Sequence, residues 1–121
     1  MGFKFSKDET FTAKVKVPVA NKEGGYDVSD YVAVFRHPDA EELKTLRATA
    51  NDELVLGSVS DGTQERKGAV LIGWQMRDDD TKQEVPFNDE TLAAAVKVPN
   101  FVMFTAMAFW EQVNGARAKN L

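Results

Sequence analysis

The segment that most restricts how this chain folds is the apolar stretch after Pro99. Between residues 101 and 113 only three side chains are polar, those of Thr105, Glu111 and Gln112. A helix over this stretch is apolar nearly all round. Because a proline disfavours helical dihedrals in the residue before it and donates no hydrogen bond, we predict a helix break near Val98 and a new helix over residues 101–113.

Such a helix needs cover on most of its faces. A bilayer is excluded, because the apolar run is only about half of the roughly 20 residues that a span needs. The chain's own core and another chain remain. A domain this small has difficulty burying a whole helix, so we expect its largest side chains to meet a partner or a second copy, with burial in the core alone as the alternative. These side chains are Phe101, Phe104, Met107 and Trp110.

A second helix is predicted directly before the first. Asn88 is a good N-cap, and Asp89 and Glu90 place negative charge at the positive end of the helix dipole. Phe87 and Leu92 have the spacing of a hydrophobic staple. We therefore expect this helix to begin at Asn88.

The N-terminal part has the pattern of strands. Residues 11–17 alternate apolar and polar side chains with a period of two, which predicts a strand with one buried face. Residues 3–5 alternate likewise, with a turn expected over residues 7–10. Pro18 is expected to end the second strand, and residues 31–36 are rich in strand formers. The pattern predicts an antiparallel meander of about three strands.

The middle of the chain is less clearly patterned. Asp39 is a predicted N-cap with Glu42 completing a capping box, and Leu43, Leu46 and Ala50 share one helix face. Residues 51–66 are predicted to contain the end of a helix, a loop, and the start of a new element near Asp61. The short apolar run 69–74 fits a helix or a strand equally well. Residues 77–82 are predicted to form a solvated turn.

We therefore predict one α+β domain over residues 1–121: a small N-terminal antiparallel β-sheet followed by a C-terminal bundle of about three to four helices. The β-rich part is residues 1–36 and the mainly helical part is residues 39–121. Flexible segments are expected near residues 51–66 and 77–84.

Composition excludes several classes of function. The net charge is −4 and no basic face gathers the Lys and Arg residues, which argues against nucleic-acid binding. With no cysteine and one histidine, disulfide frameworks and the usual zinc sites are excluded. The N-terminus shows no signal peptide. We expect a cytoplasmic protein that binds neither membrane nor nucleic acid.

No set of residues predicts catalysis, a cofactor or a metal. His37 stands alone beside Pro38 and is interpreted as a junction residue near solvent. The triplet Asp78-Asp79-Asp80 lacks the glycine and closing glutamate of an EF-hand loop, so a solvated turn is favoured over a calcium site. Trp74 is interpreted as a core anchor. We predict a protein that is not an enzyme.

The order of several motifs resembles the tail assembly chaperones of long-tailed bacteriophages. The likeness covers the last third to half of the chain, with a looser likeness where Phe35-Arg36 leads into residues 39–46. Its elements are Val70-Leu71-Ile72-Gly73-Trp74, Val85-Pro86-Phe87-Asn88-Asp89-Glu90-Thr91-Leu92, Val98-Pro99 and Gly115-Ala116-Arg117-Ala118-Lys119-Asn120. The sequence departs from the Ala-rich last helix of the family at Phe101, Met103, Phe104 and Met107.

The resemblance implies a non-enzymatic phage or prophage protein of the host cytoplasm, absent from the mature virion. It implies binding to the tape measure protein while tail tube subunits polymerise. It also implies a longer product, made by programmed frameshifting, that recruits the tube protein. Ala118-Lys119-Asn120 fits the frame of an A-AAA-AAC slippery sequence, and an ordinary solvated tail fits these residues equally well. The resemblance favours helix for the residues leading up to Gly73. A structural minor tail component or another small oligomeric interaction module is the alternative function.

Overall fold

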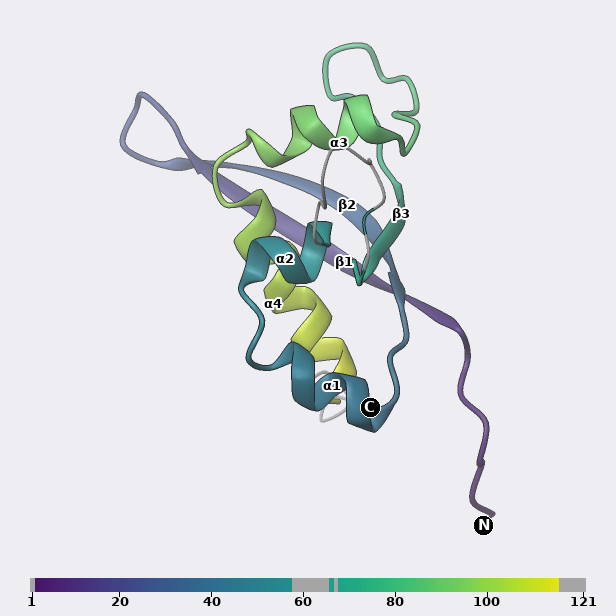
Figure 1. Ribbon diagram of the computed structural model, residues 1–121. Helices are drawn as coiled ribbons and strands as arrows, with labels where there is room; N and C mark the ends of the chain where they lie inside the picture. The colour runs from purple at the N-terminus through teal and green to yellow at the C-terminus, as the bar shows by residue number, and fades with distance from the viewer. Residues whose placement is uncertain (1, 58–65, 67, 116–121) are drawn as a thin grey trace.

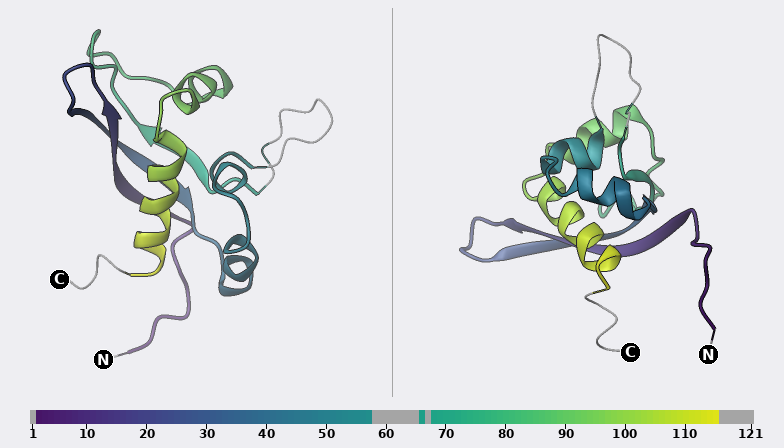
Figure 2. Two further views of the ribbon diagram at one scale, coloured as in Figure 1. Left: turned by 90° about the vertical axis from the view of Figure 1, so that its left-hand side faces the viewer. Right: turned by 60° about the horizontal axis from the view of Figure 1, so that its bottom comes forward.

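The computed structural model describes residues 2–57, 66 and 68–115. Within these residues three strands form one antiparallel sheet in the order β1-β2-β3: β1 (Thr10–Ala20), β2 (Tyr26–Arg36) and β3 (Leu71–Gln75). The same residues contain four helices: α1 (Ala40–Leu46), α2 (Asn51–Leu56), α3 (Asp89–Val96) and α4 (Phe101–Val113). They lie on one side of the sheet (Figures 1 and 2). The predicted α+β class, with a small antiparallel sheet and three to four helices, is confirmed.

The hairpin of β1 and β2 follows the alternation seen in the sequence. Ala13, Val15 and Val17 are buried, and the polar side chains between them are exposed. Their partners across the ladder include Ala33 and Tyr31, which are buried on the same face. The alternation of apolar and polar residues therefore correctly predicted which face of β1 is buried in the core.

Pro18 does not end β1, contrary to the prediction. The strand continues to Ala20, with Pro18 opposite Val28. Since β1 is an outer strand of the sheet, a residue without an N–H group is tolerated there. The Pro18 carbonyl accepts a hydrogen bond of 2.7 Å from the Asn100 side-chain amide. The position of a strand within its sheet decides whether a proline stops it.

The third strand comes from a different part of the chain than predicted. Residues 3–5 belong to no strand, and residues 71–75 supply β3, paired with β2 through Val34–Gly73 and Ala33–Trp74. The resemblance favoured a helix for the residues leading up to Gly73, and this prediction is wrong. A register shift between Val34 and Phe35 leaves Ile72 without an opposite residue and 41% exposed.

The first two helices are short. Asp39 caps α1 by accepting from the backbone N–H of Glu42 at 2.9 Å, as predicted. The capping box is not completed, because the Glu42 carboxylate accepts from Arg36 at 2.7 Å instead. α1 ends at Leu46, and Ala50 is the N-cap of a separate helix, α2, where the sequence predicted a helix end and loop. The fresh start expected near Asp61 lies outside the described residues.

The segment before the long helix follows the prediction closely. Asn88 accepts from the Thr91 N–H at 2.9 Å, and the Thr91 hydroxyl accepts from the Asn88 N–H, so the cap is reciprocal. α3 ends at Val96 and α4 begins at Phe101. Asn100 turns the chain between them in the left-handed region, with φ of 72°.

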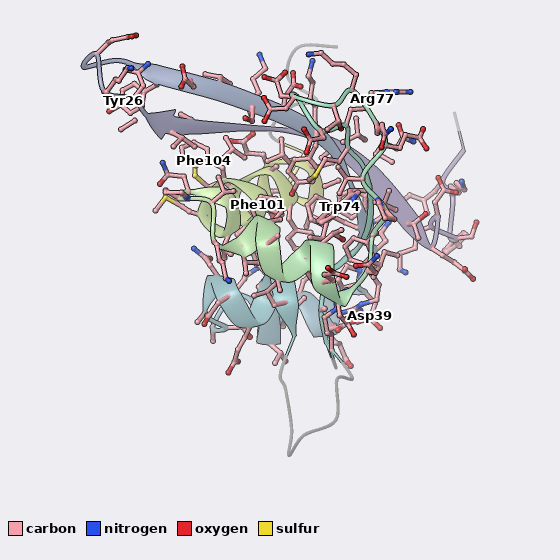
Figure 3. The ribbon with its side chains drawn as sticks, turned by 90° about the horizontal axis from the view of Figure 1, so that it is seen from above. Tyr26, Asp39, Trp74, Arg77, Phe101 and Phe104 are labelled. Carbon is pink, nitrogen blue, oxygen red and sulfur yellow. The ribbon has the colours of Figure 1, made fainter. Side chains whose placement is uncertain are left out.

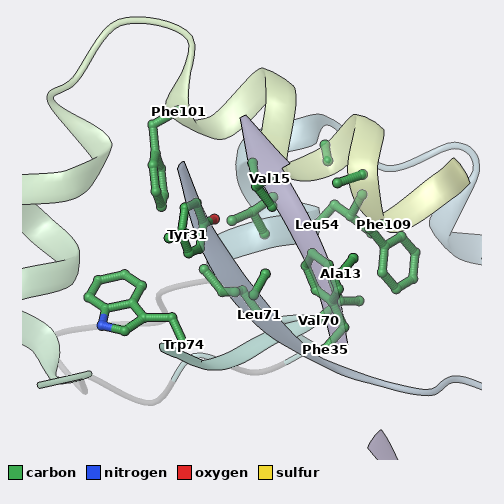
Figure 4. Close-up of a cluster of buried hydrophobic side chains, with 14 of the residues drawn as sticks. Ala13, Val15, Tyr31, Phe35, Leu54, Val70, Leu71, Trp74, Phe101 and Phe109 are labelled. Carbon is green, nitrogen blue, oxygen red and sulfur yellow. The ribbon is translucent and has the colours of Figure 1, made fainter. Parts of the chain in front are cut away.

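The core lies between the sheet and the helices, and its aromatic residues come from every layer (Figure 4). Phe35 of β2 and Phe109 of α4 are fully buried, with ring centroids 5.3 Å apart. Trp74 anchors β3, as predicted: it is 9% exposed, and its indole N–H donates to the Val85 carbonyl at 2.9 Å. The core therefore already holds one face of α4.

Candidate protein-binding surface

The sheet buries one face of α4 and leaves the other exposed. α4 packs mainly on β1 and α2. Met103 and Met107, one turn apart on the opposite face, are 50% and 45% exposed. The buried residues are Phe101, Thr105, Ala106, Ala108 and Phe109. The sequence of α4 is apolar nearly all round, but in the fold one face packs on β1 and α2 and the other is exposed to solvent.

The four predicted contact residues have separate environments. Phe101 is only 3% exposed and stacks on Tyr31 at 5.3 Å between ring centroids. It is a core residue, and we remove it from the candidate surface. Trp110 is half-buried against Phe109, and the Arg47 guanidinium lies 5.6 Å from its ring centroid. Arg47 therefore already covers part of the Trp110 ring.

Phe104 and Met107 come together at a hollow beside β1, which we call the β1–α4 hollow. It has a volume of about 340 Å³ and is open to solvent. One wall is Lys14 to Lys16 of β1, and the other is formed by Phe104, Met107, Ala108 and Glu111 of α4. Figure 3 shows Phe104 beside β1, with Tyr26 at the far end of the hairpin. The hollow has an apolar wall and charged groups at its rim.

Met103 extends this apolar surface, and the sequence analysis did not select it. It lies four residues before Met107, so the two side chains share one helix face. We call Met103, Phe104 and Met107 the α4 stripe. The i, i+4 spacing of two methionines was the signal available in the sequence. Methionine adapts its shape to different apolar partners, which suits a surface that binds another chain.

Three charged side chains of the described residues line the hollow: those of Lys14, Lys16 and Glu111. Lys14 lies 3.6 Å from the Asp30 carboxylate across the hairpin, and both side chains are well exposed. Exposed pairs of this kind contribute little to stability. Charged groups that line the hollow affect which partner is selected more than how tightly it binds.

A second apolar surface lies on the uncovered face of the hairpin. Tyr26 and Val28 are 69% and 61% exposed near its turn. Val32 and Val34, further along the same face of β2, are half-buried. This face has no helix over it in the described part of the chain (Figure 2).

The polar residues considered for chemistry have structural roles. His37 is half-buried, with its ring 5.2 Å from that of Phe11 and its Nδ1 3.1 Å from the Asp8 carbonyl. Asp78 accepts from the backbone N–H groups of Asp80 and Thr81 and so shapes the exposed turn. Among the described residues, no three His, Cys, Asp or Glu side chains gather as a metal site requires.

Burial shifts the pKa of two titratable groups among the residues that the structure describes, Tyr31 and Arg66. Desolvation raises the pKa of the Tyr31 phenol well above its ordinary value, and the hydrogen bond with Thr105 opposes this in part. Desolvation lowers the pKa of Arg66, which the Asp89 charge opposes. The Arg66 guanidinium lies over the Phe87 ring at 5.0 Å and donates to the Leu71 carbonyl at 2.9 Å. Both groups hold elements together and lie away from the hollow.

Comparison of this chain with protein-family models, with curated proteins and with solved structures finds no match. No single helix within the described residues is long and apolar enough to cross a membrane. α3 and α4 taken together, with a bend of 101° between them, pass the same test of length and composition.

Proposed function

We propose that this protein is a tail assembly chaperone of a long-tailed phage or prophage, which binds the tape measure protein and assists polymerisation of the tail tube. The observation that carries the proposal is the α4 stripe, an exposed apolar surface on a helix whose other face is in the core. The order of capped helix, proline break and aromatic helix supports it.

The stripe suits this role physically. A tape measure protein is long and must be kept from aggregating before the tube surrounds it. Two half-exposed methionines beside a half-buried phenylalanine offer an adaptable apolar contact, and the charged rim of the β1–α4 hollow limits non-specific association. Such action is non-enzymatic and takes place in the host cytoplasm, so the protein is absent from finished virions.

Co-expression with the tape measure protein of the same gene cluster tests the proposal. We expect the wild-type chain to raise the soluble fraction of the tape measure protein and to co-purify with it. Met103→Ser/Met107→Ser should remove both effects while the chain stays folded. Val28→Ser, at an exposed apolar position on the other face of the sheet, is the matched control and should behave like wild type. A tape measure protein equally soluble and unbound with and without this chain contradicts the proposal.

The family role also includes a longer, frameshifted form that recruits the tail tube protein. Its proposed origin is the tripeptide Ala118-Lys119-Asn120, which lies outside the described residues. The gene sequence tests this part separately. Codons that break the run of A, or no open frame in the −1 register, would remove the longer form and leave binding of the tape measure protein untouched.

A structural tail component is the second candidate, and the outer position of β1 favours it. A strand of 11 residues with β2 on one side only offers a backbone edge to a neighbouring subunit. Mass spectrometry of purified virions separates the two roles. A structural protein is present in many copies, and a chaperone is missing.

A further inference from the structure

The N-terminal arm, residues 2–9, is extended and belongs to no strand or helix. Phe3 and Phe5 are 80% and 94% exposed, and their rings meet at 5.1 Å between centroids. Two residues apart, they lie on the same face of the arm whenever it is extended, with Lys4 on the other. Large aromatic side chains this exposed, on a segment without its own fold, point to a binding element.

The root of the arm is fixed in a direction that leads away from its own body (Figure 1). The His37 N–H donates to the Glu9 carbonyl at 2.9 Å, which continues the ladder beyond the Thr10–Arg36 pair. The Lys7 ammonium donates to the His37 carbonyl at 2.7 Å. A turn at residues 7–10 that folded the arm back onto its own β1 would break both hydrogen bonds. The arm is therefore directed toward another molecule.

A fitting acceptor is present on the same chain. In the described part of the molecule β1 pairs with β2 alone, so its other edge, up to the Pro18 carbonyl that Asn100 binds, is available for strand addition. The β1–α4 hollow lies at that edge, along Lys14 to Lys16. Its volume of about 340 Å³ compares with the ~150 Å³ of an apolar cavity that holds one benzene. It has room for two phenyl rings.

We propose that the arm of one copy adds as a strand to the free edge of β1 in a second copy and places Phe3 and Phe5 in the β1–α4 hollow. Lys4 then points to the open face of the sheet. The exchange is reciprocal, so the product is a twofold symmetric dimer. Eight extended residues span about 26 Å, which is enough to cross between two adjacent bodies.

The size of this interface is adequate. Four phenyl rings bury roughly 600–1,000 Å² in total, and the hollows that receive them lose a comparable area. The sum reaches the ~1,000 Å² that a specific interface requires. The rings supply apolar area, and the added strand supplies backbone hydrogen bonds.

Sedimentation velocity of the isolated protein from about 1 μM to 1 mM tests the exchange. We expect the wild type to dimerise and Phe3→Ser/Phe5→Ser to raise the dimer Kd by at least about tenfold. Both rings are largely exposed in the single copy, so this variant should keep the circular dichroism spectrum of the wild type and, at concentrations where the wild type is monomeric, its Tm. Lys4→Ser, on the other face of the same arm, is the control and should dimerise normally.

A mixing experiment shows that arm and hollow meet between copies. Met107→Glu places a charge in the hollow and should dimerise poorly, like the arm variant. An equal mixture of the two variants contains one intact arm and one intact hollow, and it should regain a heterodimer that neither variant forms as a homodimer. A monomer at every concentration, a dimer whose Kd the arm variant leaves unchanged, or no recovery on mixing would each overturn the proposal. The arm of a second copy and the tape measure protein use the same residues, Phe104 and Met107, and therefore occupy the hollow in turn. These measurements use no tape measure protein, so their failure is distinct from failure of the chaperone proposal.

Discussion

Tyr31 joins the two layers of the molecule through one side chain. Its hydroxyl lies 2.5 Å from that of Thr105, so a hydrogen bond links β2 to α4 inside the core. The Tyr31 ring stacks on Phe101 and meets Trp74 edge-on at 6.1 Å. The Thr105 hydroxyl, fully buried, obtains a partner that an apolar residue at position 31 would not provide.

Burial of this phenol predicts a loss of stability in alkali. The folded state keeps the Tyr31 proton above the ordinary pKa of 10.0, whereas the unfolded chain releases it. The free energy of unfolding should therefore fall as the pH rises above about 10, by up to ~1.4 kcal/mol per pH unit from this group. Urea titrations between pH 9 and about 11.5 measure the slope. Tyr31→Phe should be less stable at neutral pH but show a shallower decline, and an equal decline in both proteins would contradict this role.

The two faces of α4 predict different responses to truncation. Phe109 is fully buried, so Phe109→Ala should lower the free energy of unfolding by about 3–5 kcal/mol. Met103 is half exposed, so Met103→Ala should change it by no more than about 0.5 kcal/mol. Thermal or urea unfolding of the two variants measures both changes in the free energy of unfolding. Similar large losses at both positions would show that Met103 belongs to the core.

Among the elements, the starts of α1 and α3 were predictable because their capping signals are local, whereas α2, which has no side-chain cap, was missed. Asp39 and Asn88 cap helices through the backbone N–H groups three residues ahead, and this depends on no distant part of the chain. Strand pairing depends on distant residues. The run 69–74 becomes a strand because β2 offers it an edge, which periodicity within six residues does not reveal.

The caps predict stability changes of opposite sign. Asn88→Ala removes a reciprocal cap from α3 and should cost about 0.5–2 kcal/mol. α2 begins at Ala50, which is exposed and has no side-chain cap, so Ala50→Ser should add up to about 1 kcal/mol. Differential scanning calorimetry should show Tm lowered in the first variant and raised in the second. A lower Tm for Ala50→Ser would contradict the boundary at Asn51.

For the whole molecule, the candidate surface was predicted only in part. Three of the four selected residues of α4 reach the surface or lie partly buried, whereas Phe101 is in the core. The sequence showed that α4 is apolar on most of its faces. It did not show which of these faces would pack against the sheet. The β1 edge beside the stripe was hidden for the same reason, because strand order is a property of the assembled sheet.

The arrangement of the sheet also fixes the order in which a nascent chain can complete it. β1 and β2 are adjacent in sequence, and a hairpin closes in about 1–10 μs. β3 begins some 35 residues after β2 ends, which at ~5–20 residues per second is about 2–7 s of translation. During that interval the β2 edge that later pairs with β3 and the apolar face of the hairpin lack their final cover. The ribosome-bound intermediate is therefore the stage at which this protein is most open to aggregation, and crowding of polysomes should matter more to its yield than the stability of the finished fold.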